Sequence, residues 1–177
     1  MGLDRRTAQM MRGRIRVLAA SIAGAGLGLF GLVFAPAEPL IWNRTGSAPA
    51  GLYRLTHAPL AHGEWVVVAA DSAEARWAAA HGFVGRDWPL IKQIAGMQGD
   101  EICRLGTDIS INGKTAGAAR LVDSRGRKLP VWEGCVVLGP EQLFLMSPHP
   151  DSLDGRYFGP VDRRDIAGVA RLVVEWE

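Results

Sequence analysis

A chain of 177 residues has room for one ordinary domain and a short appendage. Its net charge of +2 is unevenly placed, because residues 1–16 hold five arginines against the single acid Asp4. A basic end on a mildly acidic body is poor evidence for binding to nucleic acid, which we therefore do not expect as a partner. The pattern is typical of a basic cytoplasmic segment that orients a membrane protein.

The stretch from Val17 to Ala37 contains no charged residue. As a helix rising about 1.5 Å per residue it would be roughly 31 Å long, close to the hydrocarbon thickness of a bilayer. We predict a single transmembrane signal-anchor over residues 17–37 and an exported domain over residues 38–177. The sequence Ala35-Pro36-Ala37 leaves a cleaved signal peptide as the alternative, although the apolar stretch is longer than such peptides usually have.

The exported body has the composition of a β domain. Its apolar runs are short, rich in Val, Ile, Leu and Trp, and separated by Gly, Pro and Asp. We predict strands at Gly51–Leu55, Glu64–Ala69, Pro89–Ala95, Glu101–Leu105, Asp108–Ile111, Cys135–Leu138, Leu143–Met146 and Ile166–Glu175.

Local signals also predict one tight hairpin and one short helix. Asn112-Gly113 favours a hairpin turn, because both residues tolerate positive φ. The helix is expected from Ser72 to about His81, with Asp71 as its cap, Glu74 at the capping-box position and Gly82 ending it.

Two cysteines, Cys103 and Cys135, occur in the chain. In an exported domain an even count predicts a disulfide, with two buried thiols as the alternative. Neither cysteine has metal-ligand spacing with a histidine, so we expect no metal site and no cofactor.

Lys92 stands in an unusual setting for a lysine. If residues 89–95 form a strand, Leu90, Lys92 and Ile94 point to the same face, and that face should be buried. Burial lowers the pKa of an ammonium, and a neutral amine can act as a general base. Taken alone, a lysine that snorkels or lies at a strand edge is the more common outcome.

Ser47 lies in a Gly- and Pro-punctuated turn and is inert unless a base removes its proton. Together with Lys92 it supplies the parts of a Ser–Lys hydrolase. The Thr45 hydroxyl and the Ser47 backbone N–H could stabilise a developing oxyanion, and Gly46 would let the chain approach a substrate carbonyl closely.

A third stretch, residues 147–161, reads as a constrained loop rich in Pro and Gly. Ser152 could orient the Lys92 amine, and Asp154 with Arg156 could form an ion pair or act on the Ser–Lys pair. His149 offers a histidine-dependent mechanism as a rival, but its place between two prolines favours packing within the loop.

These stretches resemble the serine peptidases of the signal peptidase I superfamily, and in particular its conjugative-transfer (TraF-type) maturation branch. Residues 43–53 (NRTGSAPAGLY) fit that branch's N-x-T-x-S-x-P-x-G-L-Y pattern. A lysine strand leading into Gly-Asp follows at residues 90–100, and the loop SLDGRYFGPV at residues 152–161.

The resemblance implies a mostly β, signal-peptidase-like catalytic domain behind the anchor, with Ser47 as nucleophile and Lys92 as general base. It also implies a required acid at Asp154, an oxyanion role for Thr45 and an orienting role for Ser152. The expected enzyme is a single-pass protein of the bacterial inner membrane with its active site on the periplasmic side. Its expected partners are the lipid bilayer, an exported precursor such as a prepilin, and the conjugation machinery.

The sequence departs from the family's common residues at several places. Ala48 follows the serine where general signal peptidases usually have Met, Gln93 and Met97-Gln98 replace common residues after the lysine, and Gly155 stands where Ser is frequent. No departure removes a catalytic group. Three other functions stay open: a general type I signal peptidase, a catalytically silent scaffold of a secretion or mating-pore complex, and a self-cleaving repressor-type peptidase, which would not need an anchor.

Overall fold

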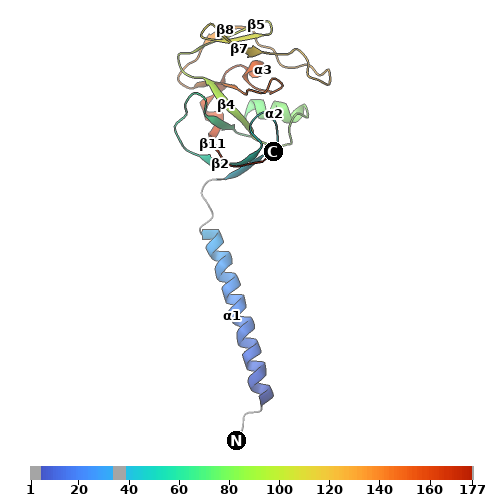
Figure 1. Ribbon diagram of the computed structural model, residues 1–177, viewed down its shortest axis with the longest axis vertical. Coiled ribbons are helices and arrows are strands. Elements are labelled where there is room, and N and C mark those ends of the chain that lie inside the picture. The colour runs from blue at the N-terminus through green and yellow to red at the C-terminus, as the bar shows by residue number, and fades with distance from the viewer. Residues whose placement is uncertain (1–4, 34–38, 177) are drawn as a thin grey trace. The chain divides into compact units, whose positions relative to one another are not determined.

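The computed structural model describes residues 5–33 and 39–176. The chain divides into two compact units, Met1–Ala37 and Glu38–Glu177 (Figure 1). In the first unit, helix α1 runs over Arg5–Val33. Among the described residues, no helix meets the length and hydropathy of a membrane span. The transmembrane segment at residues 17–37 therefore stays a prediction, and its end, residues 34–37, lies outside the described part of the chain.

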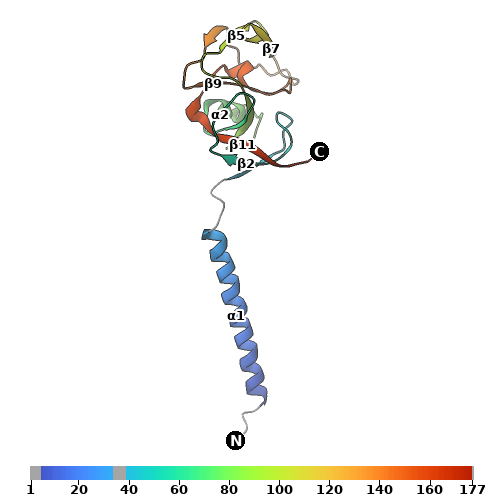
Figure 2. The same cartoon turned by 60° about the vertical axis from the view of Figure 1, so that its left-hand side comes forward.

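The second unit is built mainly from antiparallel strands, which confirms the predicted mostly β class. A larger sheet has the strand order β1-β2-β11-β3-β4-β9-β10, and a smaller one the order β7-β6-β5-β8. In both views of Figures 1 and 2, β2 and β11 lie at one end of this unit and β5 and β7 at the other. The strands of the larger sheet are β1 (Leu40–Asn43), β2 (Gly51–Thr56), β3 (Trp65–Val68), β4 (Leu90–Gly96), β9 (Gln142–Met146), β10 (Val161–Asp162) and β11 (Ile166–Glu175), and those of the smaller are β5 (Glu101–Leu105), β6 (Asp108–Ile111), β7 (Lys114–Ala118) and β8 (Gly134–Val137).

Every predicted strand is present, and those over Glu101–Leu105, Asp108–Ile111 and Ile166–Glu175 have the predicted bounds. The hairpin between β6 and β7 is confirmed as well, with Asn112 and Gly113 at φ values of 50° and 73°. Strand β7 was implied only as the second arm of that hairpin, and two short strands, β1 and β10, were not predicted at all. Each pairs with one neighbour at an edge of the larger sheet, so neither needs the longer apolar run of a central strand.

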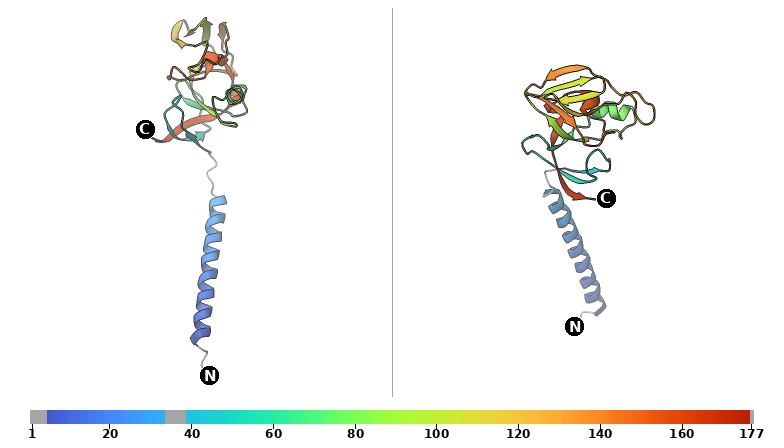
Figure 3. Two further views of the ribbon diagram at one scale, coloured as in Figure 1. Left: turned by 90° about the vertical axis from the view of Figure 1, so that its right-hand side faces the viewer. Right: turned by 45° about the horizontal axis from the view of Figure 1, so that its top comes forward.

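Helix α2 (Ala73–Ala80, green in Figure 3) is present, but the prediction of its cap was wrong. Ser72 rather than Asp71 is the N-cap, and its hydroxyl accepts the Ala75 N–H at 3.1 Å. Ser72 reaches the third helical position, so Glu74 stands at the second position rather than in a capping box. A further helix, α3 (Gly155–Phe158), and a 3-10 turn over Arg163–Asp165 follow near the end of the chain.

The predicted disulfide is confirmed. Cys103 on β5 and Cys135 on β8 lie directly opposite each other in the ladder and are joined by an S–S bond of 2.04 Å. The bond therefore ties two neighbouring strands of the smaller sheet.

The core that supports the candidate site lies between β3, β4, β9 and β11. Val66, Ile94 and Leu145 are among its fully buried members, and Ala75 of α2 packs against them. A second cluster holds Ala48, which fixes the segment after Ser47 against Tyr53 and neighbouring side chains.

Candidate active site

The loop between β1 and β2 carries Ser47 and is anchored immediately after it. Ala48 is buried at 4% exposure, and the Tyr53 hydroxyl donates to the Pro49 carbonyl at 2.8 Å. Burial raises the pKa of Tyr53, as does the charge of Glu175, so the phenol keeps the proton that it donates. Ser47 itself is half-buried, at the apex of an anchored turn.

Asn43, the last residue of β1, organises this loop and was not predicted to have a role. Its amide nitrogen donates to the carbonyls of Thr45, Ala48 and Pro49 at 3.0–3.1 Å. Its amide oxygen accepts the Thr45 N–H at 3.1 Å and the Thr45 hydroxyl at 2.8 Å. An asparagine bonding to the backbone two residues on is an Asx turn, and Asn-x-Thr before Gly could have signalled it.

Lys92 lies in the middle of β4 and is buried, with 5% of its surface exposed. Leu90 and Ile94 on the same face are buried too, which confirms the predicted apolar setting. The pKa of Lys92 falls from 10.5 to about 8, mainly because burial penalises the ammonium; Asp154 raises it and Arg156 lowers it. The amine donates to Ser152 Oγ at 2.8 Å, so the serine expected to orient the amine contacts it.

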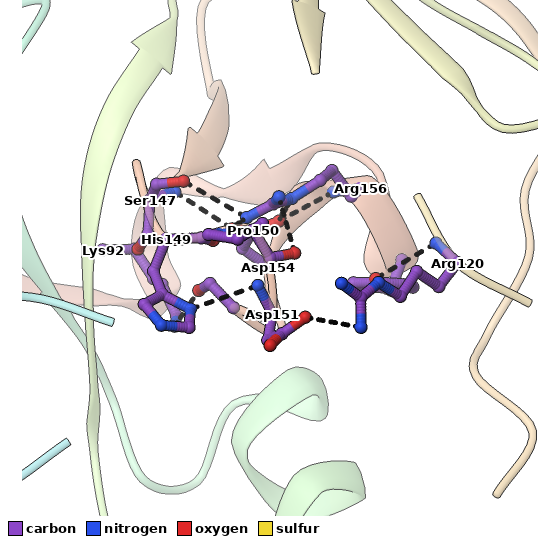
Figure 4. Close-up of polar contacts among 10 residues, drawn as sticks. Lys92, Arg120, Ser147, His149, Pro150, Asp151, Asp154 and Arg156 are labelled. Carbon is purple, nitrogen blue, oxygen red and sulfur yellow. Dashed lines mark hydrogen bonds and ion pairs between the residues drawn. The ribbon is translucent and has the colours of Figure 1, made fainter. Parts of the chain in front are cut away.

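Asp154 and Arg156 form a buried ion pair of 2.7 Å, with side-chain exposures of 0% and 4%. Burial lowers the pKa of Arg156, but hydrogen bonding and charge from Asp154 outweigh it and raise the pKa overall. The pair is more than a surface salt bridge, because Arg156 Nη2 also donates to the carbonyls of Ser147 and His149, and the Ser147 N–H donates to Asp154 (Figure 4). It therefore fixes the loop that presents Ser152.

His149 lies on this loop, but its side chain is not packed within the loop as predicted. Its ring is exposed and lies beside the loop that carries Ser47, since a Cβ built at Gly46 would be 3.8 Å from His149 Cδ2. The Asp151 N–H donates to His149 Nδ1 at 3.1 Å (Figure 4). A neutral ring in this position must carry its proton on Nε2.

A cavity of about 510 Å³ brings the three stretches together. Ser47 and Thr45 line it from the first loop, Lys92 from β4, and Ser152 and His149 from the third stretch. Apolar side chains complete its walls, among them Ile41, Val84, Trp88 and Leu153. Asp154 and Arg156 belong instead to the buried network behind Ser152. A cavity with an apolar wall, three hydroxyls and an amine of lowered pKa can accommodate acyl transfer from an extended peptide.

Comparison with known proteins agrees with the motifs. The family model described as "Signal peptidase, peptidase S26" matches residues 12–176. An Escherichia coli plasmid transfer protein TraF is 34% identical over 165 residues, covering 86% of this chain and 92% of that protein. A probable conjugal transfer protein TraF of Sinorhizobium fredii is 31% identical over 145 residues, covering 76% of both. A solved signal peptidase I from Enterococcus faecalis V583 aligns with a TM-score of 0.38 and 16% identity, covering 64% of this chain and 98% of that one.

Proposed function

The chain belongs to the peptidase S26 family of signal peptidases, and from this membership we propose that it is a serine endopeptidase with Ser47 as nucleophile and Lys92 as general base. One observation carries the assignment: a buried amine whose pKa is about 8 opens onto the same cavity as Ser47. An amine with this pKa is neutral in roughly a tenth of the molecules at pH 7 and in about half at pH 8, far more often than an ordinary lysine, so it can act as a general base.

In the proposed reaction, neutral Lys92 takes the proton of Ser47 as Oγ bonds to the scissile carbonyl carbon. The C–N bond then breaks, and the departing amine takes the proton from the Lys92 ammonium. Water next gives a proton to Lys92 and attacks the acyl carbon, which frees the new carboxyl group and returns the proton to Ser47. The peptide's own N-terminal amine could replace water and give a cyclic product.

The supporting roles follow from the contacts. Ser152 orients the Lys92 amine through its 2.8 Å hydrogen bond. The Ser47 backbone N–H and the Thr45 hydroxyl are the proposed oxyanion donors. Before attack Asn43 holds the Thr45 proton, and the hydroxyl turns to the oxyanion only as Ser47 bonds to the carbonyl. The burial of Asp154 against Arg156 supports an indirect role for that acid, fixing the Ser152 loop and tuning Lys92 by its charge.

The proposed substrate is an exported, pilin-like precursor of a conjugative transfer system, because the relatives carry plasmid and conjugal transfer names. The proposed location is the bacterial inner membrane, with residues 17–37 as the anchor and the catalytic unit on the periplasmic side. The uncharged stretch from Val17 to Ala37 behind five arginines supports this placement.

The catalytic assignment is tested with the full chain in detergent and N-acetyl-Ala-Ala-Ala p-nitrophenyl ester. Acylation releases p-nitrophenolate, intact mass shows that one acyl group is added, and tandem mass spectrometry of the digested protein locates it on Ser47. Ser47→Ala and Lys92→Ala should each slow release by about 10³-fold or more while the domain stays folded. The matched controls Ser124→Ala and Lys114→Ala change exposed residues and should behave as wild type. Wild-type rates in Ser47→Ala or Lys92→Ala would refute the assignment.

The substrate class is tested separately by offering the membrane-embedded enzyme a conjugative pilin precursor and an ordinary secreted preprotein. Cleavage of the pilin precursor alone supports the maturation role, whereas cleavage of both favours a general signal peptidase. A product one water lighter than the linear peptide identifies the peptide amine as the group that resolves the acyl-enzyme.

A further inference from the structure

The geometry points to Asn43 as a positioning residue that keeps the Thr45 hydroxyl proton away from Ser47 Oγ, leaving the nucleophile's lone pairs free to attack. This inference rests on the proposed function, since it concerns how Ser47 is prepared for acylation. It depends on which atom donates in each hydrogen bond of the chain from Asn43 through Thr45 to Ser47.

The orientation of the Asn43 amide is fixed by its surroundings. The amide nitrogen faces three backbone carbonyls at 3.0–3.1 Å. A carbonyl oxygen can only accept a hydrogen bond, so the group that faces it must be the NH2. The amide oxygen faces the Thr45 backbone N–H, which can only donate. The amide nitrogen and the amide oxygen therefore require the same orientation of the Asn43 side chain. Asn43 is buried, with 7% of its surface exposed, which leaves little access for competing water.

The position of the Thr45 proton follows from this orientation. The Asn43 oxygen has no proton to give, so in the 2.8 Å contact the Thr45 hydroxyl must be the donor. A hydroxyl has a single proton, which means that Thr45 Oγ1 can only accept in its second contact, the 3.2 Å approach of Ser47 Oγ. The Ser47 hydroxyl is thus the donor to Thr45.

This direction favours attack by Ser47. At 3.2 Å the contact is longer than the usual 2.7–2.8 Å for hydroxyl pairs, so the Ser47 proton is weakly held and is easily released toward the Lys92 amine. If Asn43 were absent, Thr45 could instead donate to Ser47 Oγ. That bond would occupy one of the two lone pairs of Ser47 Oγ and draw electron density from the oxygen that attacks the substrate carbonyl.

A double-mutant cycle on the acylation rate tests this role, using the same tripeptide ester. Asn43→Ala removes both the orientation of Thr45 and the bonds to the loop carbonyls, whereas Thr45→Val removes the hydroxyl through which Asn43 would act. Asn43→Ala should slow acylation about fivefold more in the Thr45 protein than in the Thr45→Val background, a coupling typical of contacting residues. Thr45→Ser, which keeps the hydroxyl, should preserve the coupling.

Asn43→Asp is the matched control, because it keeps an acceptor oxygen for Thr45 and loses the amide donors. Its effect on acylation should be the same in both backgrounds. If Asn43→Ala does not fold, Asn43→Leu, which has a similar volume and no acceptor for Thr45, takes its place in the cycle. An equal slowing by Asn43→Ala in both backgrounds, with a matching drop in unfolding temperature, would reduce Asn43 to a structural residue and overturn the inference. The proposed function would survive that result, since wild-type Ser47 would still be acylated; absence of acylation in wild type would remove both.

Discussion

The amine of Lys92 donates to the hydroxyl of Ser152 across 2.8 Å, with both side chains buried. One partner comes from the middle of a central strand and the other from a loop fixed by Asp154 and Arg156. Because the Lys92 amine can rotate about a flexible stem, this contact is what directs it within the cavity. The orientation of the proposed general base is therefore set by a residue that need not touch the substrate.

Replacing Ser152 should therefore disable the base without removing it. Ser152→Ala leaves the buried Lys92 amine without its hydroxyl partner, and we expect acylation of the tripeptide ester to slow about 10- to 100-fold, with a stability loss of about 1–3 kcal/mol. Ser152→Thr keeps a hydroxyl and should retain much of the rate. A fully active Ser152→Ala enzyme would show that the strand alone orients Lys92.

The buried ion pair should control the pH dependence of acylation. Because the neutral amine is the proposed base, the rate should rise with pH through a midpoint near the Lys92 pKa of about 8. Asp154 raises that pKa and Arg156 lowers it, so Asp154→Asn should move the midpoint to lower pH and Arg156→Gln to higher pH.

Both substitutions also leave a buried charge unpaired, at a cost of about 3–5 kcal/mol, so the profiles must be measured below the unfolding transition. Circular dichroism at each pH provides the control for folding. Midpoints that shift in the same direction would mean that the two charges do not act on Lys92 as opposite electrostatic influences.

The disulfide should stabilise the domain without taking part in the chemistry. It closes a loop between positions 32 apart, and the loss of loop-closure entropy on the unfolded chain predicts about 3–4 kcal/mol of stability. The Cys103→Ala/Cys135→Ala protein should lose that amount in denaturant unfolding and acylate at nearly the wild-type rate at low temperature. An acylation rate that collapses while the domain remains folded would instead couple the smaller sheet to the active site.

The sequence was most informative where a local pattern determined the outcome. Lys92 could be recognised because alternation along a strand places it between Leu90 and Ile94, and all three are buried. The hairpin at Asn112-Gly113 was equally local. The role of Asn43 was not predictable in this way, since its bonds to Ala48 and Pro49 exist only once the loop has closed.

The choice of cap on α2 failed for a related reason. Asp71 and Ser72 are both good caps by residue type, and the backbone alone decides which side chain reaches the Ala75 N–H. The burial of Asp154 with Arg156 was likewise left open, because a charged pair in a loop is usually exposed.

Gly155 shows where the family's common residue should not suit this chain. A Cβ at this position would lie 2.6 Å from the Leu145 carbonyl oxygen and 2.7 Å from Phe144 Cε2, so Gly155→Ser requires the backbone beside Asp154 to shift. We expect a loss of about 1–3 kcal/mol in denaturant unfolding from this overpacking, together with slower acylation as the Asp154–Arg156 pair moves. Gly139→Ala is the matched control, because its new methyl group would meet only Gln142 Oε1 at an ordinary 3.6 Å and should change stability little. If Gly155→Ser unfolds at the wild-type denaturant concentration, α3 and β9 are not packed as closely as these contacts require.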